Sequence, residues 1–242
     1  MYEHLLPPLP PSAVEGLEAL GRALDRTHPV RAKHRKDLPY AVADLSRALT
    51  CERDTLRKDY MGNKRSLSAY LRYFLPWNVY RLSRLFSGLG FDLPDDAVLA
   101  DLGSGPLTAP IALWLARPDL RQRRLTLKCV DRSPTAMKSG LALFDHLAGR
   151  DIPWKVELVK GAFGANLRGK VDLLLAANVL NEVLRPGRGL EERAWRLARD
   201  VRGQLSDAGR LLVVEPGVRR GGPTLAAVRA ALMEEDMAPL AP

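Results

Sequence analysis

The 242-residue sequence has only two cysteines and no long apolar run. Cys51 and Cys129 lie far apart, which is typical of free thiols in a reducing cytoplasm. The sequence also has only four histidines, which are scattered. The cysteines and histidines form no cluster with metal-ligand spacing, so the sequence predicts no metal site. No segment approaches the roughly 20 apolar residues of a membrane span, and residues 1–12 lack the regions of a secretory signal. We therefore expect a soluble, cytoplasmic protein without a membrane partner.

The charge that the chain does carry is unevenly placed. In total, 37 Lys and Arg face 28 Asp and Glu, a formal charge of +9. Residues 22–84 hold 15 of the basic and 6 of the acidic residues (+9), and the remainder holds 22 of each sign. A basic segment attached to a neutral remainder favours a polyanionic partner, most simply nucleic acid. A solvated basic helical surface is the alternative.

Three stretches of the chain differ in pattern. Residues 1–12 are proline-rich and predict an extended arm. Residues 13–90 carry apolar residues at three- and four-residue spacing, which predicts a basic, helical N-terminal unit. Residues 91–242 alternate between short apolar segments and helical segments. Strands are expected at 98–102, 125–130, 154–159, 171–176 and 210–215, and helices at 111–116, 135–147, 190–205 and 224–234. This order predicts an α/β fold with a parallel, doubly wound, Rossmann-like sheet.

Within the helical unit, one helix is expected to carry Leu67 to Phe74. Ser66 or Ser68 could cap its N-terminus. Pro76 is expected to end or kink it, because proline lacks a backbone N–H.

The first strand runs into a glycine-rich loop from Asp101 to Gly105. Glycines let the backbone turn sharply and let a ligand approach the main chain. A nicotinamide site would have a third glycine where Thr108 stands. The loop therefore favours a methyl-donor site that includes Asp101, Gly103, Ser104 and Gly105. A tight strand–helix turn without a ligand is the alternative.

The second and third strands end in two further candidate binding segments. Asp131 and Arg132 follow the second strand, 26 residues after the loop. An acidic side chain there can accept both hydroxyls of an adenosine ribose and disfavours a 2′-phosphate; a helix cap before Ser133 is the alternative. Ala162 and Phe163 follow the third strand, where an adenine edge could lie. Phe163 either stacks on that ring or packs in the core.

Polar residues follow the fourth strand. Asn178, Asn181 and Glu182 come directly after an apolar run. In an open α/β sheet, ligands bind at the carboxyl ends of the strands. These three residues are therefore candidates for orienting a methyl acceptor, and Asn178 is also a candidate cofactor contact. A turn and helix cap is the alternative.

Four segments together resemble one family. They are Tyr70–Asn78 (YLRYFLPWN), Asp101–Pro106 (DLGSGP), Asn178–Val183 (NVLNEV) and Val214–Gly217 (VEPG). On these segments, the chain resembles the methyltransferase-like proteins of the mitochondrial ribosomal small subunit and their bacterial relatives, over roughly residues 45–235. The resemblance implies a class I methyltransferase fold, S-adenosylmethionine as cofactor, small-subunit ribosomal RNA as partner and a role in ribosome assembly.

The chain departs from that family after its Glu-Pro-Gly segment. The resemblance implies a cysteine-rich segment there that holds an iron–sulfur cluster, but neither cysteine of this chain lies in that region. The chain alone therefore cannot supply four cysteine ligands. The pattern also predicts five strands, without the two-stranded hairpin that normally ends a methyltransferase sheet. We expect the parent protein to continue beyond Pro242; a naturally minimal relative is the alternative.

These observations predict an S-adenosylmethionine-dependent methyltransferase acting on small-subunit ribosomal RNA. Eight basic residues of the N-terminal unit are predicted to contact phosphates: Arg53, Arg57, Lys58, Lys64, Arg65, Arg72, Arg81 and Arg84. Aromatic residues interleaved with them could stack on unpaired bases or fill the helical core. The alternative function is a catalytically silent assembly factor that binds ribosomal RNA. The basic segment disfavours a small-molecule methyltransferase, and the positions of both cysteines disfavour methylation at cytosine C5, which needs a cysteine nucleophile.

Overall fold

Five short apolar segments form a parallel sheet in the computed structural model, which describes residues 5–52, 59–184, 186–217 and 221–241. The strands are β1 (Ala97–Leu102), β2 (Leu125–Asp131), β3 (Trp154–Lys160), β4 (Val171–Ala177) and β5 (Leu205–Val214). Their spatial order is β3-β2-β1-β4-β5. All five predicted strands are confirmed, and they form the predicted Rossmann-like, parallel sheet.

Strand β5 begins at Leu205, earlier than the predicted start near 210. Leu205 pairs with Val171, whereas Arg210 pairs with Leu173, so the intervening residues of β5 bulge out of the ladder. Turn-forming residues in this bulge (Ser-Asp-Ala-Gly) hide the start of the strand from a pattern-based prediction.

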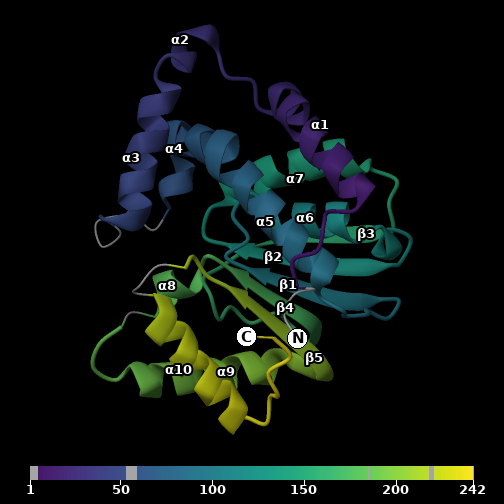
Figure 1. Cartoon of the computed structure of the whole chain (residues 1–242), viewed down its shortest axis with the longest axis vertical. Helices are drawn as coiled ribbons and strands as arrows, with labels where there is room; N and C mark the ends of the chain where they lie inside the picture. Colours follow the sequence, from purple (N-terminus) through teal and green to yellow (C-terminus); the bar gives the residue numbers. More distant parts are fainter. Residues whose placement is uncertain (1–4, 53–58, 185, 218–220, 242) are drawn as a thin grey trace.

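Helices cover both faces of the sheet (Figure 1). One face is covered by α1 (Pro11–Thr27), α5 (Leu75–Gly88), α6 (Thr108–Ala116) and α7 (Pro134–Ala148). The other face is covered by α9 (Leu190–Gln204) and α10 (Gly221–Glu234). The shorter elements are α2 (Ala32–Arg35), α3 (Leu38–Thr50), α4 (Lys64–Ala69), α8 (Leu180–Val183), the 3₁₀ turns η2 (Tyr60–Gly62) and η4 (Pro118–Leu120), and the π-helical turn η3 (Tyr70–Phe74).

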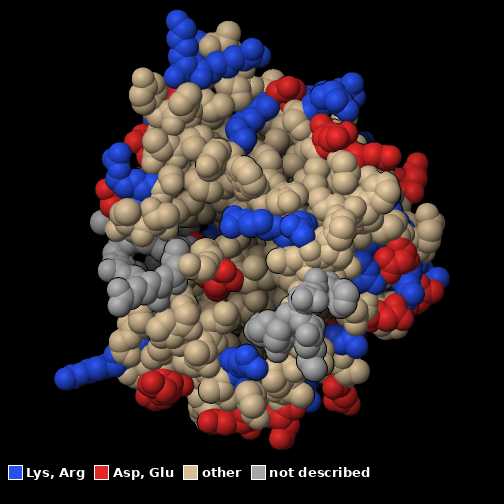
Figure 2. Space-filling model, viewed as in Figure 1, with Lys and Arg blue, Asp and Glu red and all other residues tan. Residues whose placement is uncertain are grey.

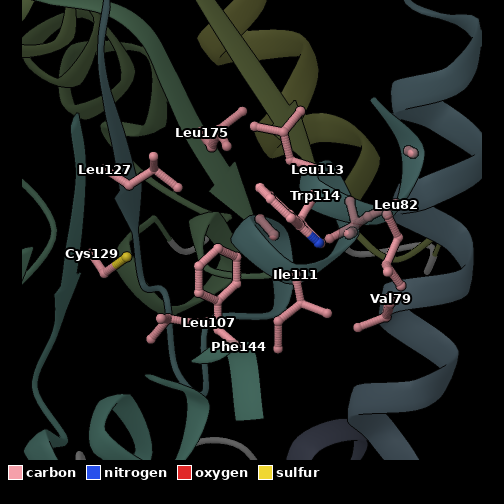
Figure 3. Packing of buried hydrophobic residues seen from close by; sticks show 14 of the residues in the cluster. Val79, Leu82, Leu107, Ile111, Leu113, Trp114, Leu127, Cys129, Phe144 and Leu175 are labelled. Carbon is pink, nitrogen blue, oxygen red and sulfur yellow. The ribbon is translucent and has the colours of Figure 1, made fainter. Parts of the chain in front are cut away.

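The N-terminal helices share their hydrophobic core with the sheet. Val79 and Leu82 of α5 belong to the same buried cluster as Ile111 of α6 and Leu175 of β4 (Figure 3). Each such side chain contributes about 1.5–3 kcal/mol to stability when fully buried. Helices α1 and α5 therefore belong to the core of the sheet domain, which fixes the position of the polar side chains that α5 carries.

Asn63 caps the helix that carries Leu67, so the prediction of Ser66 or Ser68 as the cap is wrong. The Asn63 Oδ1 atom accepts hydrogen bonds from the backbone N–H groups of Arg65, at 2.8 Å, and Ser66, at 3.3 Å. Asn is among the preferred N-cap residues, because its short side chain reaches the free N–H groups of the first turn.

The prediction was that Pro76 ends or kinks the helix, and the first of these alternatives is wrong, because helical structure continues through Pro76. In a regular α-helix, the ring of a proline clashes with the carbonyl four residues earlier. Here the preceding turn, η3, is π-helical, and the Leu75 N–H bonds to the Tyr70 carbonyl, five residues back. The wider turn accommodates the ring, and helical structure runs from α4 through η3 into α5.

Candidate active site

A cavity of about 280 Å³ opens at the carboxyl ends of the strands. The chain crosses from β1 outward to β2 and β3, and then returns to the other side of β1 for β4 and β5. Such a switch in strand order leaves a crevice where ligands of α/β proteins bind. The loops after the strands contribute Gly103, Gly105, Asp131, Arg132, Ala162, Phe163, Asn178 and Glu182 to its wall. The N-terminal helices contribute Leu49, Thr50, Tyr60, Met61, Tyr70, Phe74, Asn78 and Arg81.

The glycine-rich loop bends back over the end of β2. The backbone N–H groups of Gly103 and Ser104 both donate to the Val130 carbonyl, at 2.9 and 3.0 Å. Gly103 has a φ of +75°, and a Cβ atom at this position would lie 2.5 Å from Cγ2 of Val179. A side chain here would therefore be strained and would collide with the loop after β4. The backbone conformation and the close contact with Val179 therefore require glycine at position 103.

Asp131 joins the glycine-rich loop to the start of α7. One carboxylate oxygen accepts from the Gly105 N–H at 2.9 Å, and the other accepts from the Ser133 N–H at 2.7 Å. Burial raises the pKa of Asp131, and these two N–H groups act in the opposite direction. Each carboxylate oxygen can accept a second hydrogen bond. Ser133, whose hydroxyl accepts from the Ala136 N–H, caps α7, so Asp131 is not the capping residue.

Asp101 lies beneath the loop, beside a second, small cavity of about 20 Å³. Its Oδ2 atom and the hydroxyls of Ser104 and Thr108 are buried without hydrogen-bond partners among the described residues. Burial raises the pKa of Asp101 to about 7, and the Asp131 charge raises it further. Buried polar groups are nearly always satisfied. These three atoms border the small cavity, whose volume suits a single water-sized group.

The wall after β4 is held by Glu215, for which the sequence predicted no role. The Glu215 carboxylate accepts from the Leu180 N–H at 2.7 Å and from Nδ2 of Asn181 at 2.6 Å. Asn178 has a φ of +59°, which Asn tolerates better than most residues, and its N–H donates to the Val214 carbonyl. Asn178 and Glu182 line the cavity, whereas Asn181 is turned toward Glu215.

Helix α5 and the turn before it contribute a series of hydrogen-bonded polar side chains to the opposite wall of the cavity. Asn78 donates from Nδ2 to the Tyr70 hydroxyl at 3.4 Å and accepts from Arg81 at 2.6 Å. Burial raises the pKa of Tyr70, and the Asn78 amide acts against it. Phe74, Asn78 and Arg81 recur at four- and three-residue spacing, which places them on one helix face. This spacing is the feature of the sequence from which the helical wall of the cavity could have been predicted.

The basic residues predicted to bind RNA are placed differently from one another. Arg53, Arg57 and Lys58 lie outside the described residues. Lys64 is exposed, and Arg81 lines the cavity. Both have the access that a phosphate contact needs.

Three other predicted RNA contacts have partners within the protein. Arg65 pairs with Asp37 and Asp44, both at 2.8 Å. Arg72 is mostly buried, pairs with Asp25 at 2.6 Å, and also donates to two backbone carbonyls. Arg84 donates to the carbonyls of residues 6 and 7, which holds the proline-rich segment on α5. RNA binding by these three residues stays a prediction, and each would exchange an intramolecular partner for a phosphate.

The two cysteines lie in unlike surroundings. Cys129 is buried in β2, and burial together with the nearby Asp101 charge raises the pKa of its thiol. Cys51 is exposed at the end of α3. Among the described residues, no group of three or more His, Cys, Asp or Glu side chains could hold a metal ion, and no iron–sulfur ligand set is formed. None of the described helices is both long and apolar enough to cross a membrane.

In sequence, neither a protein-family model nor a curated protein matches this chain. In structure it is similar to several methyltransferases. Mitomycin 7-O-methyltransferase MmcR is 18% identical, with a TM-score of 0.48 over 93% of this chain and 61% of its own. TnmH is 21% identical, with a TM-score of 0.49 over 82% and 57%. The ribosomal protein L11 methylase from Lactobacillus delbrueckii subsp. bulgaricus is 20% identical, with a TM-score of 0.44 over 68% and 73%. This chain thus spans less than two thirds of the length of MmcR and of TnmH.

Proposed function

We propose that the cavity binds S-adenosylmethionine and that the protein transfers its methyl group to small-subunit ribosomal RNA. The observation that carries the cofactor assignment is the position of Asp131. Its carboxylate is fixed at the end of β2 by N–H groups from the glycine-rich loop and from α7, and it faces the cavity. A carboxylate held in this way retains one acceptor site on each oxygen for the two hydroxyls of a ribose.

The other residues of the cavity fit the remaining parts of this cofactor. Gly103 and Gly105 allow close approach to the backbone. Ala162 and Phe163 line the side of the cavity beyond Asp131, where a flat ring can pack. Asp101 lies beneath the glycine-rich loop, and the cationic amino group of the cofactor, bound in the main cavity above it, would favour the ionised form of this carboxyl.

The bound cofactor would supply an electrophilic methyl group on a sulfonium. The protein's contribution is to position the acceptor, since alignment of the reacting atoms supplies much of the rate of such transfers. Asn178 and Glu182 line the cavity and are the candidates for this role. Asn181, which donates to Glu215, holds the turn that carries them. The buried Cys129 thiol, with its raised pKa, does not suit a nucleophile.

Two features support RNA as the substrate. The basic excess of the chain falls within residues 22–84, and helices from this segment line the cavity beside the proposed cofactor site. The resemblance in four sequence segments adds the small ribosomal subunit. Arg81 lines the cavity and is the candidate for contact with a phosphate near the methylated nucleotide.

A catalytically silent assembly factor is the second candidate function. It is favoured by the position of Asn181, whose Nδ2 atom donates to Glu215 and which does not line the cavity. In that case the cavity would bind the cofactor as a structural ligand, and the basic segment would still bind RNA.

Calorimetry with S-adenosylmethionine, followed by transfer of labelled methyl groups to small ribosomal subunit particles, tests both functions. Binding together with label in the ribosomal RNA supports the enzyme. Binding without transfer, even to particles from early assembly, supports the silent factor. If the cofactor does not bind, the proposed site is wrong in either case.

A further inference from the structure

The end of the molecule farthest from α9 and α10 carries a dense group of exposed cations, which we call the basic tip. It consists of α2 and its flanking residues, and its four cations are Arg31, Lys33, Arg35 and Lys36. All four are exposed. Figure 1 shows α2 at this end, and Figure 2 shows Lys and Arg side chains gathered there.

The charges of the basic tip are not neutralised by the protein. The sequence has no acidic residue between Arg26 and Asp37. Asp37, the nearest acid, accepts two hydrogen bonds from the Arg65 guanidinium, at 2.8 and 3.3 Å. Within the described part of the chain, none of the four cations forms an ion pair. A local charge of this density attracts a polyanion strongly at moderate salt concentration.

We propose that the basic tip binds the phosphates of a single-stranded RNA segment on the same strand as the nucleotide that enters the cavity, several nucleotides away from it. This inference rests on the proposed function, in that it takes RNA as the partner. It assigns the backbone contacts to residues outside the cavity. Phosphate contacts of this kind set affinity and register, while the cavity reads the base.

Helix α3 sets the distance between the tip and the cavity. It begins at Leu38, two residues after Lys36, and its last residues, Leu49 and Thr50, line the cavity. Its 13 residues span about 20 Å at roughly 1.5 Å per residue. At a stacked spacing of roughly 3.4 Å, this length corresponds to about six nucleotides. The tip thus holds the strand about six nucleotides from the target.

An exposed aromatic ring lies beside the basic tip. Tyr40, in the first turn of α3, is 69% exposed. The next residue, Ala41, is buried against Ala69, so this turn of α3 is anchored and the ring projects from a fixed support. An aromatic ring among cations is the arrangement with which proteins bind single strands, because bases stack on it whatever their sequence.

The lack of large apolar side chains within residues 31–36 argues against an anionic membrane as the partner. A helix that binds a membrane surface needs apolar residues that enter the acyl layer. Within residues 31–36 the apolar side chain is Ala32, which is too small to anchor the tip.

The test measures binding of the full chain to a labelled single-stranded RNA of about 12 nucleotides, by fluorescence anisotropy over a range of salt concentrations. The tip variant replaces its four cations with Gln: Arg31→Gln, Lys33→Gln, Arg35→Gln and Lys36→Gln. The matched control removes four exposed or partly exposed cations elsewhere: Arg150→Gln, Arg199→Gln, Arg202→Gln and Arg229→Gln. Both variants lose the same net charge.

The tip variant is expected to bind at least about tenfold more weakly at low salt. Its plot of log affinity against log salt should be shallower by about 3, because each phosphate contact on a single strand contributes roughly 0.7 to the slope. The control should change the slope by much less. Equal effects of the two variants would show that only net charge matters and would overturn the assignment.

Two further arms separate the remaining outcomes. Tyr40→Ala should weaken binding by about tenfold while Tyr40→Phe retains it, because the ring and not the hydroxyl stacks. Anionic vesicles that compete with the RNA, and bind the wild type as tightly, would favour a membrane and sink the proposal. If the wild type binds no RNA, the RNA part of the proposed function fails as well. If it binds RNA and the tip variant is unchanged, only the tip assignment fails.

Discussion

The Glu215 carboxylate accepts a hydrogen bond from the Asn181 side-chain amide at 2.6 Å, across 34 residues of sequence. With its second oxygen it accepts from the Leu180 N–H, so one side chain at the end of β5 holds the turn that follows β4. Because Asn178 and Glu182 stand on that turn, the position of the proposed acceptor side depends on a residue outside the cavity wall.

Exchanging the two partners tests this dependence. Glu215→Gln should lower the free energy of unfolding by about 1–3 kcal/mol, because hydrogen bonds to a charged group are lost. Asn181→Asp should destabilise as well, since it sets two carboxylates face to face. The double variant, Asn181→Asp with Glu215→Gln, restores a donor opposite a carboxylate and keeps the net charge. Urea unfolding should show a favourable coupling of at least about 0.5 kcal/mol, and additive effects would contradict the pairing.

Asp131→Ala should weaken S-adenosylmethionine binding by about 1–3 kcal/mol, the scale of a lost charged hydrogen bond. Calorimetry measures the change directly. Asp172→Ala is the control, because Asp172 also accepts from a backbone N–H (of Val98) and from Ser206 but does not line the cavity. It should affect stability and leave the affinity of the folded protein unchanged. Equal affinity in wild type and Asp131→Ala would place the ribose elsewhere.

Two glycine-to-alanine substitutions within helices should change the free energy of unfolding in opposite directions. Gly140 of α7 packs directly on the glycine-rich loop, where an added Cβ would lie 2.2 Å from the Pro106 carbonyl carbon. Gly140→Ala must push α7 from the loop and should destabilise the fold by about 1–3 kcal/mol. An added Cβ at Gly21 of α1 meets nothing within 4 Å. Gly21→Ala should therefore stabilise by about 0.5–1 kcal/mol, as expected for an open helix position. Urea midpoints for the two variants measure the contrast, and the same sign for both would show that the α7–loop contact is looser than described.

The buried Asp101 should make the protein less stable as pH rises. Its pKa is raised to about 7 in the folded chain, against about 4 in an unfolded one. Between these values the folded state binds more protons than the unfolded state, so the free energy of unfolding falls with increasing pH. Asp131, whose pKa is also raised, acts in the same direction.

Asp101→Asn isolates that contribution. Unfolding in urea at about pH 5 and about pH 8 should show a smaller loss of stability for the variant, and at pH 8 the variant should be more stable than wild type by about 1 kcal/mol or more. The pKa values of Asp37, Asp96 and Asp119 are lowered by arginine partners, so their effects fall below this window. A parallel pH dependence in both proteins would mean that Asp101 is ionised in the fold.

The strand-end side of the cavity could be predicted because the relevant information is local. An apolar strand followed by Gly-x-Gly or by an acid needs no distant partner to be recognised, and Gly103, Asp131 and Phe163 all line the cavity. The alternation of strands and helices likewise predicted the parallel sheet. The first residues of β5 were missed because the bulge in this strand consists of turn-forming residues.

The helical side could not be predicted in the same way, since its geometry depends on pairs far apart in sequence. Arg72 lies in a basic stretch of sequence typical of an RNA contact. Its partner Asp25 is 47 residues away, and the two side chains meet only because α1 packs beside η3. Arg65 and Asp37 are 28 residues apart. Charge counts find the basic segment; the tertiary fold decides which of its cations remain free to meet a ligand.

The π-helical turn before Pro76 also changes the phase of the helix that follows it. Buried side chains recur at Leu67, Leu71, Leu75 and Val79, every four residues, which would drift by about 120° around a regular helix. The π-helical turn contains one extra residue, which compensates about 100° of this rotation and keeps the four side chains on one face. A deletion of one residue within η3 would restore a regular α-helix and rotate Asn78 and Arg81 away from the cavity, so insertions and deletions here should be less tolerated than substitutions.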